Sequence, residues 1–357
     1  MTSIAIAAPS QLLSAIGETI TMSATGKTAK GAAVGNLTFT WSSSNPGVAT
    51  VANGLALRSG TAAPDQRRRG RRDGQCAVSV RQTASQVTVT FATDTIRAIG
   101  DTARAIAAAR DSRGNPITGR TVTWTSGNPA VVTVDGNGLM TAIAEGSAIV
   151  RGVSGSAQGE RTMQVRQRAA RLIFLRQPSP ARAGVAFTIQ PQGELQDARG
   201  NRVSTDNATV VTASVGGTGG GGTVVSGATA TANGGVVTFT VLAIGGPVGL
   251  KVLRLQAPST STASSEAFAL SAGNPSTVIA ASGNAQNGLA GNALPQPLVA
   301  GVRDAFGNPV AGVDMNFTVT QGTGTVNPAQ AVTDANGNAA TDHTLSRYAG
   351  NSTVTGA

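Results

Sequence analysis

Short runs in which apolar and polar residues alternate recur along the whole chain. In the first part of the chain such runs lie at 4–6, 18–24, 37–41 and 48–51. Alternation over a few residues is typical of a β-strand that buries one face. Turn signals separate the runs, and Asn53-Gly54 is a dipeptide that favours tight hairpins. The pattern therefore predicts an all-β chain.

Two stretches of the chain repeat each other closely. The run TFTWSSSNPGVATV, which holds Trp41, returns as TVTWTSGNPAVVTV, which holds Trp124, at an offset of 83 residues (124 − 41). The same offset relates the turn at Gly17 to the turn at Gly100. Phe39 and Trp41 share one face of their run, so both are expected in the core. A fixed period this long indicates that each repeat is one small domain.

The repeat predicts a tandem array of four immunoglobulin-like β-sandwich domains. About seven strands with turns every 8–12 residues or so are typical of this fold. The expected domains are 1–83, 84–167, 168–271 and 272–357. The linkers between them are expected to be a few residues long. Short linkers restrict bending, so the expected array is a semi-rigid rod.

Motifs in three of the expected domains resemble bacterial Ig-like families. The pattern Trp-Ser/Thr-Ser-x-Asn-Pro-x-Val-x-Thr-Val at Trp41 and Trp124 is similar to group 2 bacterial Ig-like domains. The runs LPQPL at 294–298, DAFGNPV at 304–310 and TDANG at 333–337 resemble the group 1 domains of invasin- and intimin-like adhesins. The third expected domain is Ig-like by weaker analogy. These families bring no catalytic residues to this sequence.

The resemblance implies a structural or adhesive role. Modules of this kind form adhesin stalks, decorate phage virions and separate enzyme domains. The favoured interpretation is a non-catalytic, extracellular stalk of a bacterial cell-surface protein, with an unidentified glycan or protein ligand. Two alternatives stay open: a phage virion surface module that binds host carbohydrate, and a spacer or carbohydrate-binding region of a secreted enzyme.

Composition narrows the partner classes. The chain has 357 residues, of which 12% are charged and 3% aromatic, with a net charge of +10. Nucleic-acid binding needs a concentrated basic patch or stacking aromatics. The charge outside 56–76 is dispersed, so no nucleic-acid partner is expected. No run reaches the ~18 apolar residues of a membrane span. No export signal is visible in 1–20, so this segment is expected to be part of a longer, exported chain.

The stretch 56–76 departs from the repeat. It holds six arginines and two aspartates, where the second domain has a strand-like run at 148–157. The favoured explanation is a corrected frameshift, because moving suitable codons for 65–76 by one base gives a strand-like run. A solvated loop and a functional basic loop are the alternatives. Burying unpaired charge costs several kcal/mol, so the arginines at 67–69 are expected to point outward in a looped-out segment of a less stable first domain.

Few residues are candidates for catalysis. His343 is the only histidine, and it is expected at the surface with no oriented carboxylate of the kind a catalytic triad needs. Cys76 is the only cysteine, which rules out a disulfide within the chain and supports neither zinc binding nor a nucleophile. Tyr348 is the aromatic residue expected to be exposed. No catalytic residue and no cofactor are therefore expected.

Acidic residues recur in one type of turn. Asp-x-x-Gly-Asn occurs at Asp111, Asp197 and Asp304, and Asp-x-Asn-Gly-Asn occurs at Asp334. Aspartate and asparagine side chains accept hydrogen bonds from the backbone a few residues on, which explains their use in turns. Calcium needs about six or more oxygen ligands, typically from several carboxylates. Turn chemistry is the favoured explanation, and the four aspartates are weak candidates for calcium ligands.

Overall fold

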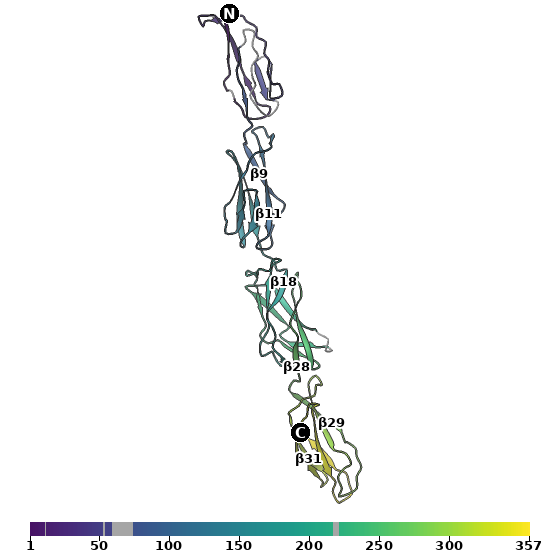
Figure 1. Ribbon diagram of the computed structural model, residues 1–357. Helices are drawn as coiled ribbons and strands as arrows, with labels where there is room; N and C mark the ends of the chain where they lie inside the picture. Colours follow the sequence, from purple (N-terminus) through teal and green to yellow (C-terminus); the bar gives the residue numbers. More distant parts are fainter. Residues whose placement is uncertain (11, 53, 59–73, 217–220) are drawn as a thin grey trace. The chain divides into compact units, whose positions relative to one another are not determined.

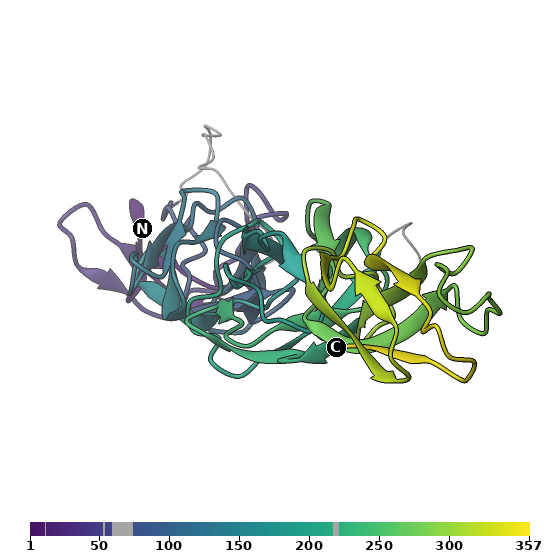
Figure 2. The ribbon, with the colours of Figure 1, turned by 90° about the horizontal axis from the view of Figure 1, so that it is seen from below.

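The protein is all-β, as the sequence predicts. The computed structural model describes residues 1–10, 12–52, 54–58, 74–216 and 221–357, and over these residues it contains strands and no helix (Figures 1 and 2). Contacts divide the chain into two compact units, 1–167 and 168–357. Each unit is described by itself.

Each strand among the described residues pairs only with strands of the same stretch of chain, and there are four such stretches. We call them the first group (β1–β8, residues 3–80), the second group (β9–β17, residues 86–165), the third group (β18–β28, residues 171–271) and the fourth group (β29–β35, residues 275–356). No ladder among the described residues joins two groups. The groups coincide with the four expected domains, but that each is a separate domain stays a prediction.

The second group is a sandwich of two sheets. Its strands are β9 (Gln86–Phe91), β10 (Thr95–Ile96), β11 (Thr102–Arg110), β12 (Pro116–Ile117), β13 (Thr123–Ser126), β14 (Val132–Val134), β15 (Leu139–Ala142), β16 (Gly146–Ser154) and β17 (Ala157–Val165). One sheet has the order β10-β17-β16-β13, and the other has β12-β11-β15-β14 with β9 beside β11. Alternate residues of both sheets, such as Val89, Met140, Val150 and Met163, meet in one aliphatic core.

The first group has shorter strands. They are β1 (Ser3–Ala7), β2 (Leu12–Leu13), β3 (Thr19–Thr21), β4 (Ser23–Lys27), β5 (Ala33–Val34), β6 (Ala49–Ala52), β7 (Leu55–Arg58) and β8 (Ser79–Val80). They form sheets β1-β4-β5 and β3-β7-β6 and a parallel pair of β2 with β8. The sequence predicts that the strand pattern is disrupted over 56–76. This prediction is wrong for 56–58, because these residues belong to β7, which pairs with β3 and β6. The arginines at 67–69 lie outside the described residues, so their expected position stays a prediction.

The strand expected at 37–41 is wrong. Those residues are not in a strand, and Phe39 and Trp41 are half-buried rather than in a core. Their counterpart in the second group is β13, which β16 holds by pairing along Thr123–Ser126. By the 83-residue offset, the counterpart of β16 falls at 63–71, which lies outside the described residues. Among the described residues, therefore, no strand is placed to pair with 37–41.

The third group has the largest core. Its strands are β18 (Arg171–Arg176), β19 (Ala181–Arg182), β20 (Gln192–Gln196), β21 (Val210–Gly216), β22 (Thr223–Ser226), β23 (Thr229–Asn233), β24 (Val236–Thr238), β25 (Ala243–Gly245), β26 (Gly249–Gln256), β27 (Ala263–Ser264) and β28 (Phe268–Ser271). Phe187 and Phe268 meet edge to face in this core, with ring centroids 5.4 Å apart. Leu195, Leu253 and Leu255 beside them are fully buried. This core is mostly aliphatic and also holds the buried Phe239.

The fourth group repeats the two-sheet plan. Its strands are β29 (Pro275–Ser282), β30 (Leu298–Asp304), β31 (Asp314–Gln321), β32 (Thr325–Asn327), β33 (Gln330–Val332), β34 (Asn338–Thr344) and β35 (Thr353–Gly356). The sheets have the orders β29-β30-β34-β32 and β33-β31-β35. Met315 and Phe317 of β31 are buried, and Val319 is half-buried. Alternate apolar residues of this strand therefore face inward.

Two leucines on β26 test whether burial holds the third group together. Leu253 is fully buried, whereas Leu250 on the same strand is 62% exposed. Leu253→Ala is expected to lower the free energy of unfolding by ~2–5 kcal/mol, because it removes buried methyl groups and leaves a cavity. The matched control Leu250→Ala is expected to change it by no more than ~0.5 kcal/mol. Hydrogen exchange in peptides from 168–271, followed through a urea series, measures both changes. Equal effects of the two substitutions would contradict the assignment of the core.

Candidate functional site

The four acidic turns share one local geometry. In each turn, Oδ1 of the aspartate accepts hydrogen bonds from the backbone N–H groups two and four residues later, at 2.8–3.0 Å. The glycine between them has a positive φ, for example 82° at Gly114 and at Gly307, which a residue with a Cβ rarely adopts. The turns at Asp111, Asp197, Asp304 and Asp334 therefore confirm the predicted turn chemistry.

Bonds to the second carboxylate oxygen, Oδ2, distinguish the turns at Asp111 and Asp304 from the turn at Asp334. Oδ2 of Asp111 accepts Nε2 of Gln82 at 2.9 Å and the backbone N–H of Ile16 at 3.0 Å. Oδ2 of Asp304 accepts the backbone N–H of Gly273 at 2.8 Å. Asp111 and Asp304 are buried, and Asp334 is exposed. Asp111 and Asp304 thus have bonds to both carboxylate oxygens, including bonds from outside the turn.

These hydrogen bonds lower the pKa of the carboxyl groups of Asp111 and Asp304. Burial by itself raises the pKa of Asp111, but the hydrogen bonds from Gln82, Ile16 and Asn115 together outweigh burial and hold the pKa well below its usual value. Burial also raises the pKa of Asp304, and hydrogen bonds from Asn308, Gly273 and Phe306 outweigh it in the same direction. Both carboxyls are therefore held in the ionised form.

The calcium expectation is a separate question. Over the described ranges, no group of three or more His, Cys, Asp or Glu side chains is placed to hold a metal ion. Amide hydrogen bonds account for the orientation of Asp111 and Asp304. Whether Asp111, Asp197, Asp304 or Asp334 binds calcium stays a prediction.

His343 is buried, so its expected surface position is wrong. Only 2% of the residue is exposed, on β34. Its Nδ1 lies 3.0 Å from the carbonyl oxygen of Thr325, and its Nε2 lies 2.8 Å from Oγ of Ser352. The neighbouring Asp342 points to the other face of the strand and is exposed. Strand alternation, with Thr341 and His343 on one face, was the signal in the sequence that could have placed the histidine inward.

The remaining candidates are one cysteine and three aromatic residues. Cys76 is a partly exposed free thiol in the first unit. Tyr348 in the second unit is 83% exposed, as expected. Trp41 and Trp124 are half-buried. No two of these residues are brought together by a hydrogen bond or ring contact that the described part of the chain records.

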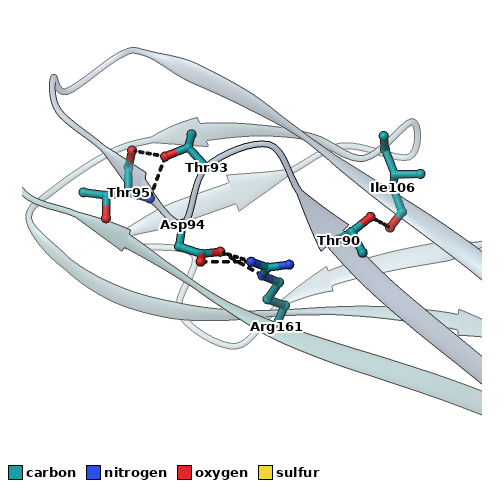
Figure 3. Close-up of polar contacts among 6 residues, drawn as sticks. All are labelled: Thr90, Thr93, Asp94, Thr95, Ile106 and Arg161. Atoms are coloured by element: carbon teal, nitrogen blue, oxygen red, sulfur yellow. Dashed lines mark hydrogen bonds and ion pairs between the residues drawn. The ribbon is translucent and has the colours of Figure 1, made fainter.

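Sequence reasoning missed an ion pair in the second group. Asp94, between β9 and β10, accepts two hydrogen bonds from Arg161 of β17, at 2.8 and 2.9 Å (Figure 3). The Arg161 guanidinium also lies over the ring of Phe91, 5.3 Å from its centroid. The two residues are 67 positions apart, so no local pattern could reveal them. This pair ties the turn after β9 to the neighbouring sheet.

Comparison with protein-family models identifies two of the groups. Residues 85–165 match the model for bacterial Ig-like domain (group 2), and residues 278–357 match the model for bacterial Ig-like domain (group 1). The chain carries tandem bacterial Ig-like domains. Both matches agree with the resemblance in the sequence. No match was found among curated proteins.

Several solved structures match parts of this chain. The Escherichia coli adhesin FdeC is 20% identical over 76% of this chain and 91% of its own, with a TM-score of 0.33. Yersinia pseudotuberculosis InvD is 18% identical over 75% of this chain and 81% of its own, with a TM-score of 0.28. Domains 4 and 5 of the S-layer protein SbsC are 18% identical over 53% of this chain and 100% of theirs, with a TM-score of 0.25.

Among the residues that the structure describes, no helix is long and apolar enough to cross a membrane.

Acid is expected to destabilise the fourth group through Asp304. Its pKa is lowered in the folded protein, so the stability it contributes is present above the unfolded pKa of about 3.9 and is lost as the pH falls through the folded pKa. Melting temperature measured from about pH 6 to pH 2 should fall less steeply for Asp304→Asn than for the parent protein. Asp314→Asn, which removes an exposed carboxyl on the same strand group, should keep the parent slope. A parent slope in Asp304→Asn would contradict the assigned role.

Calcium is expected to leave the protein unchanged. Amide donors already bond both oxygens of Asp111 and Asp304, and a calcium ion would have to replace them. Millimolar calcium chloride or excess chelator should therefore leave the melting temperature of every transition unchanged. Isothermal titration with calcium supplies an independent measurement. Saturable binding that disappears in Asp111→Asn or Asp304→Asn would show that the turns are metal sites.

Proposed function

We propose that this chain is a non-catalytic, extracellular stalk of a bacterial cell-surface protein, built as a semi-rigid rod of bacterial Ig-like domains. The observation that carries the proposal is that strand groups follow one another along the chain with very short connections. Five residues separate β8 from β9, and three residues separate β28 from β29. Short connections leave little chain to bend, so load and position pass from one sandwich to the next.

The side chains support a passive role. The candidate catalytic residue His343 is buried against Thr325 and Ser352, with its ring nitrogens bonded to a carbonyl and a hydroxyl. A general base must reach the proton that it removes from a substrate. A buried histidine in a strand is a structural residue by that criterion.

The ligand of such a stalk would be a surface glycan or protein. Carbohydrate platforms commonly present exposed aromatic rings that stack on sugars. Tyr348 is highly exposed, while Trp41 and Trp124 are half-buried. This supports a protein ligand, or projection of another part of the protein, over glycan stacking. A virion surface module and an enzyme spacer remain the competing functions.

Surface display is the testable part of this proposal. In the bacterium that encodes the chain, antibodies against 168–357 are expected to label intact cells, and external protease should remove the label. A cytoplasmic enzyme probed on the same cells is the control, and it should stay protected. Labelling that requires lysis would overturn the cell-surface assignment, and labelling of phage particles instead would establish the virion alternative.

A further inference from the structure

The turn at Asp111 contacts the preceding strand group. It follows β11 in the second group, yet its two polar side chains bond the backbone of Ile16 in the first group. Oδ2 of Asp111 accepts the N–H of Ile16 at 3.0 Å, and Nδ2 of Asn115 donates to the carbonyl oxygen of Ile16 at 3.0 Å. One turn thus satisfies both backbone groups of one residue in the preceding group.

The turn at Asp304 makes corresponding bonds in the second unit. Asn308 donates from Nδ2 to the carbonyl oxygen of Gly246 at 3.0 Å, and its Oδ1 accepts the N–H of Val248 at 3.0 Å. Both partners lie between β25 and β26 of the third group. Oδ2 of Asp304 accepts the N–H of Gly273 in the connection to the fourth group. Again the aspartate accepts a backbone N–H and the asparagine donates to a backbone carbonyl, both outside the turn's own strands.

The central residue of each turn lies against a glycine of the preceding group. Arg113 lies beside Gly17, where an added Cβ would be 3.8 Å from its Cδ. Phe306 lies against Gly184 and Gly245, where an added Cβ would be 3.1 and 2.3 Å from its ring. Phe306 also packs against the core of the third group. Gly17 and Gly184 have nearly equal positive φ values, 77° and 76°. The first and third groups therefore each place a glycine of similar backbone conformation beside the turn.

The connecting residues are bonded on both sides. Between the first and second groups, Thr83 donates its N–H to Ser14 at 2.9 Å, while Gln82 donates to Asp111. Between the third and fourth groups, Gly273 donates its N–H to Asp304 and accepts a bond from Arg182 at 3.2 Å. The connections are therefore fixed to the groups on either side of them.

Two further turns have the same internal capping without these outward bonds. Asp334 and Asp135 each accept two backbone N–H groups of their own turn at 2.8–2.9 Å. Both are exposed, and neither has a recorded bond to another group among the described residues. Capping a turn therefore does not require the outward bonds, which makes those of Asp111 and Asp304 a separate feature.

We propose that the Asp-x-x-Gly-Asn turns at Asp111 and Asp304 are junction clamps, whose partner is the end of the preceding bacterial Ig-like domain of the same chain. Apart from the bond that Asp111 accepts from Gln82, the carboxylate and the amide bind backbone groups outside the turn, so the clamp depends chiefly on the backbone of the preceding domain end. The central residue fills the space above a glycine. Domain ends of different sequence can therefore be joined by one motif, and each junction is held in one orientation.

The Asp304 junction can be tested in the full chain with pairs of spin labels. Cys76→Ser removes the native thiol, and Thr212→Cys with Thr318→Cys places labels on exposed positions of β21 and β31. Pulsed electron paramagnetic resonance then measures the spread of distances across the junction. Asp304→Asn keeps one oxygen for the turn but points an amide N–H₂ at the N–H of Gly273. Asn308→Ala removes the side-chain bonds to Gly246, Val248 and Oδ2 of Asp304, and keeps the backbone N–H that caps the turn.

Both variants are expected to broaden the distance distribution by about twofold or more, because domains without a firm interface move relative to each other. Asp334→Asn is the matched control, and it should keep the parent width. A second pair, Thr277→Cys with Thr318→Cys, lies within the fourth group and should stay narrow in every variant, which shows that the sandwich itself is folded.

The measured distance distributions distinguish a clamp at the junction from a turn that acts only within its own domain. Broadening across the junction with a narrow pair inside the fourth group supports the clamp. If Asp304→Asn also broadens the inner pair, Asn308→Ala decides the matter alone. A parent width across the junction in Asn308→Ala, or equal broadening in Asp334→Asn, overturns the proposal. The measurement is made on purified protein, so it is independent of whether the chain is displayed on a cell.

Discussion

Burial of aliphatic side chains between paired sheets is the interaction on which the other features depend. The only cysteine is a free thiol, so no disulfide supports the sandwiches. The second group holds Val89, Val150 and Met163 in one core, and the third holds Leu195, Leu253 and Leu255 in another. Each fully buried residue of this type contributes on the order of 1.5–3 kcal/mol against the entropy of ordering the chain. The acidic turns and the ion pair at Asp94 add bonds outside these aliphatic cores.

The polar features of the chain act at the ends and edges of those cores. Arg161 and Asp94 hold a turn to a neighbouring strand, and His343 ties β34 to Thr325 and Ser352. Asp111 and Asp304 go further, because their bonds leave their own strand group. Buried carboxylates are stable only when their oxygens are hydrogen-bonded, so a domain end that supplies backbone N–H groups makes burial of these aspartates favourable. Polar residues here determine how sandwiches connect more than whether they form.

Local features were predictable from the sequence, and features that need a distant partner were not. The strands at β9 and β31 and the caps of the acidic turns follow from alternation and turn chemistry within a few residues. The alternation at 37–41 matches that of β13, which β16 holds by pairing, but 37–41 is not a strand, and the counterpart of β16 falls outside the described residues. Only the fold brings Asp94 near Arg161. Sequence alternation defines a face, but the ladder beside it decides whether a strand forms.

The acidic turns show the same division within one motif. Asp304 and Asp334 read almost alike in the sequence, and both cap their own turn in the same way. Their second oxygens differ, because Asp304 at the end of β30 pairs with Pro275, the first residue of the fourth group, whereas Asp334 lies between β33 and β34. Position relative to a domain boundary therefore changes the role of an identical local structure. The role of a repeated motif in a tandem array therefore depends both on the bonds within its own turn and on the groups of the neighbouring domain that contact it.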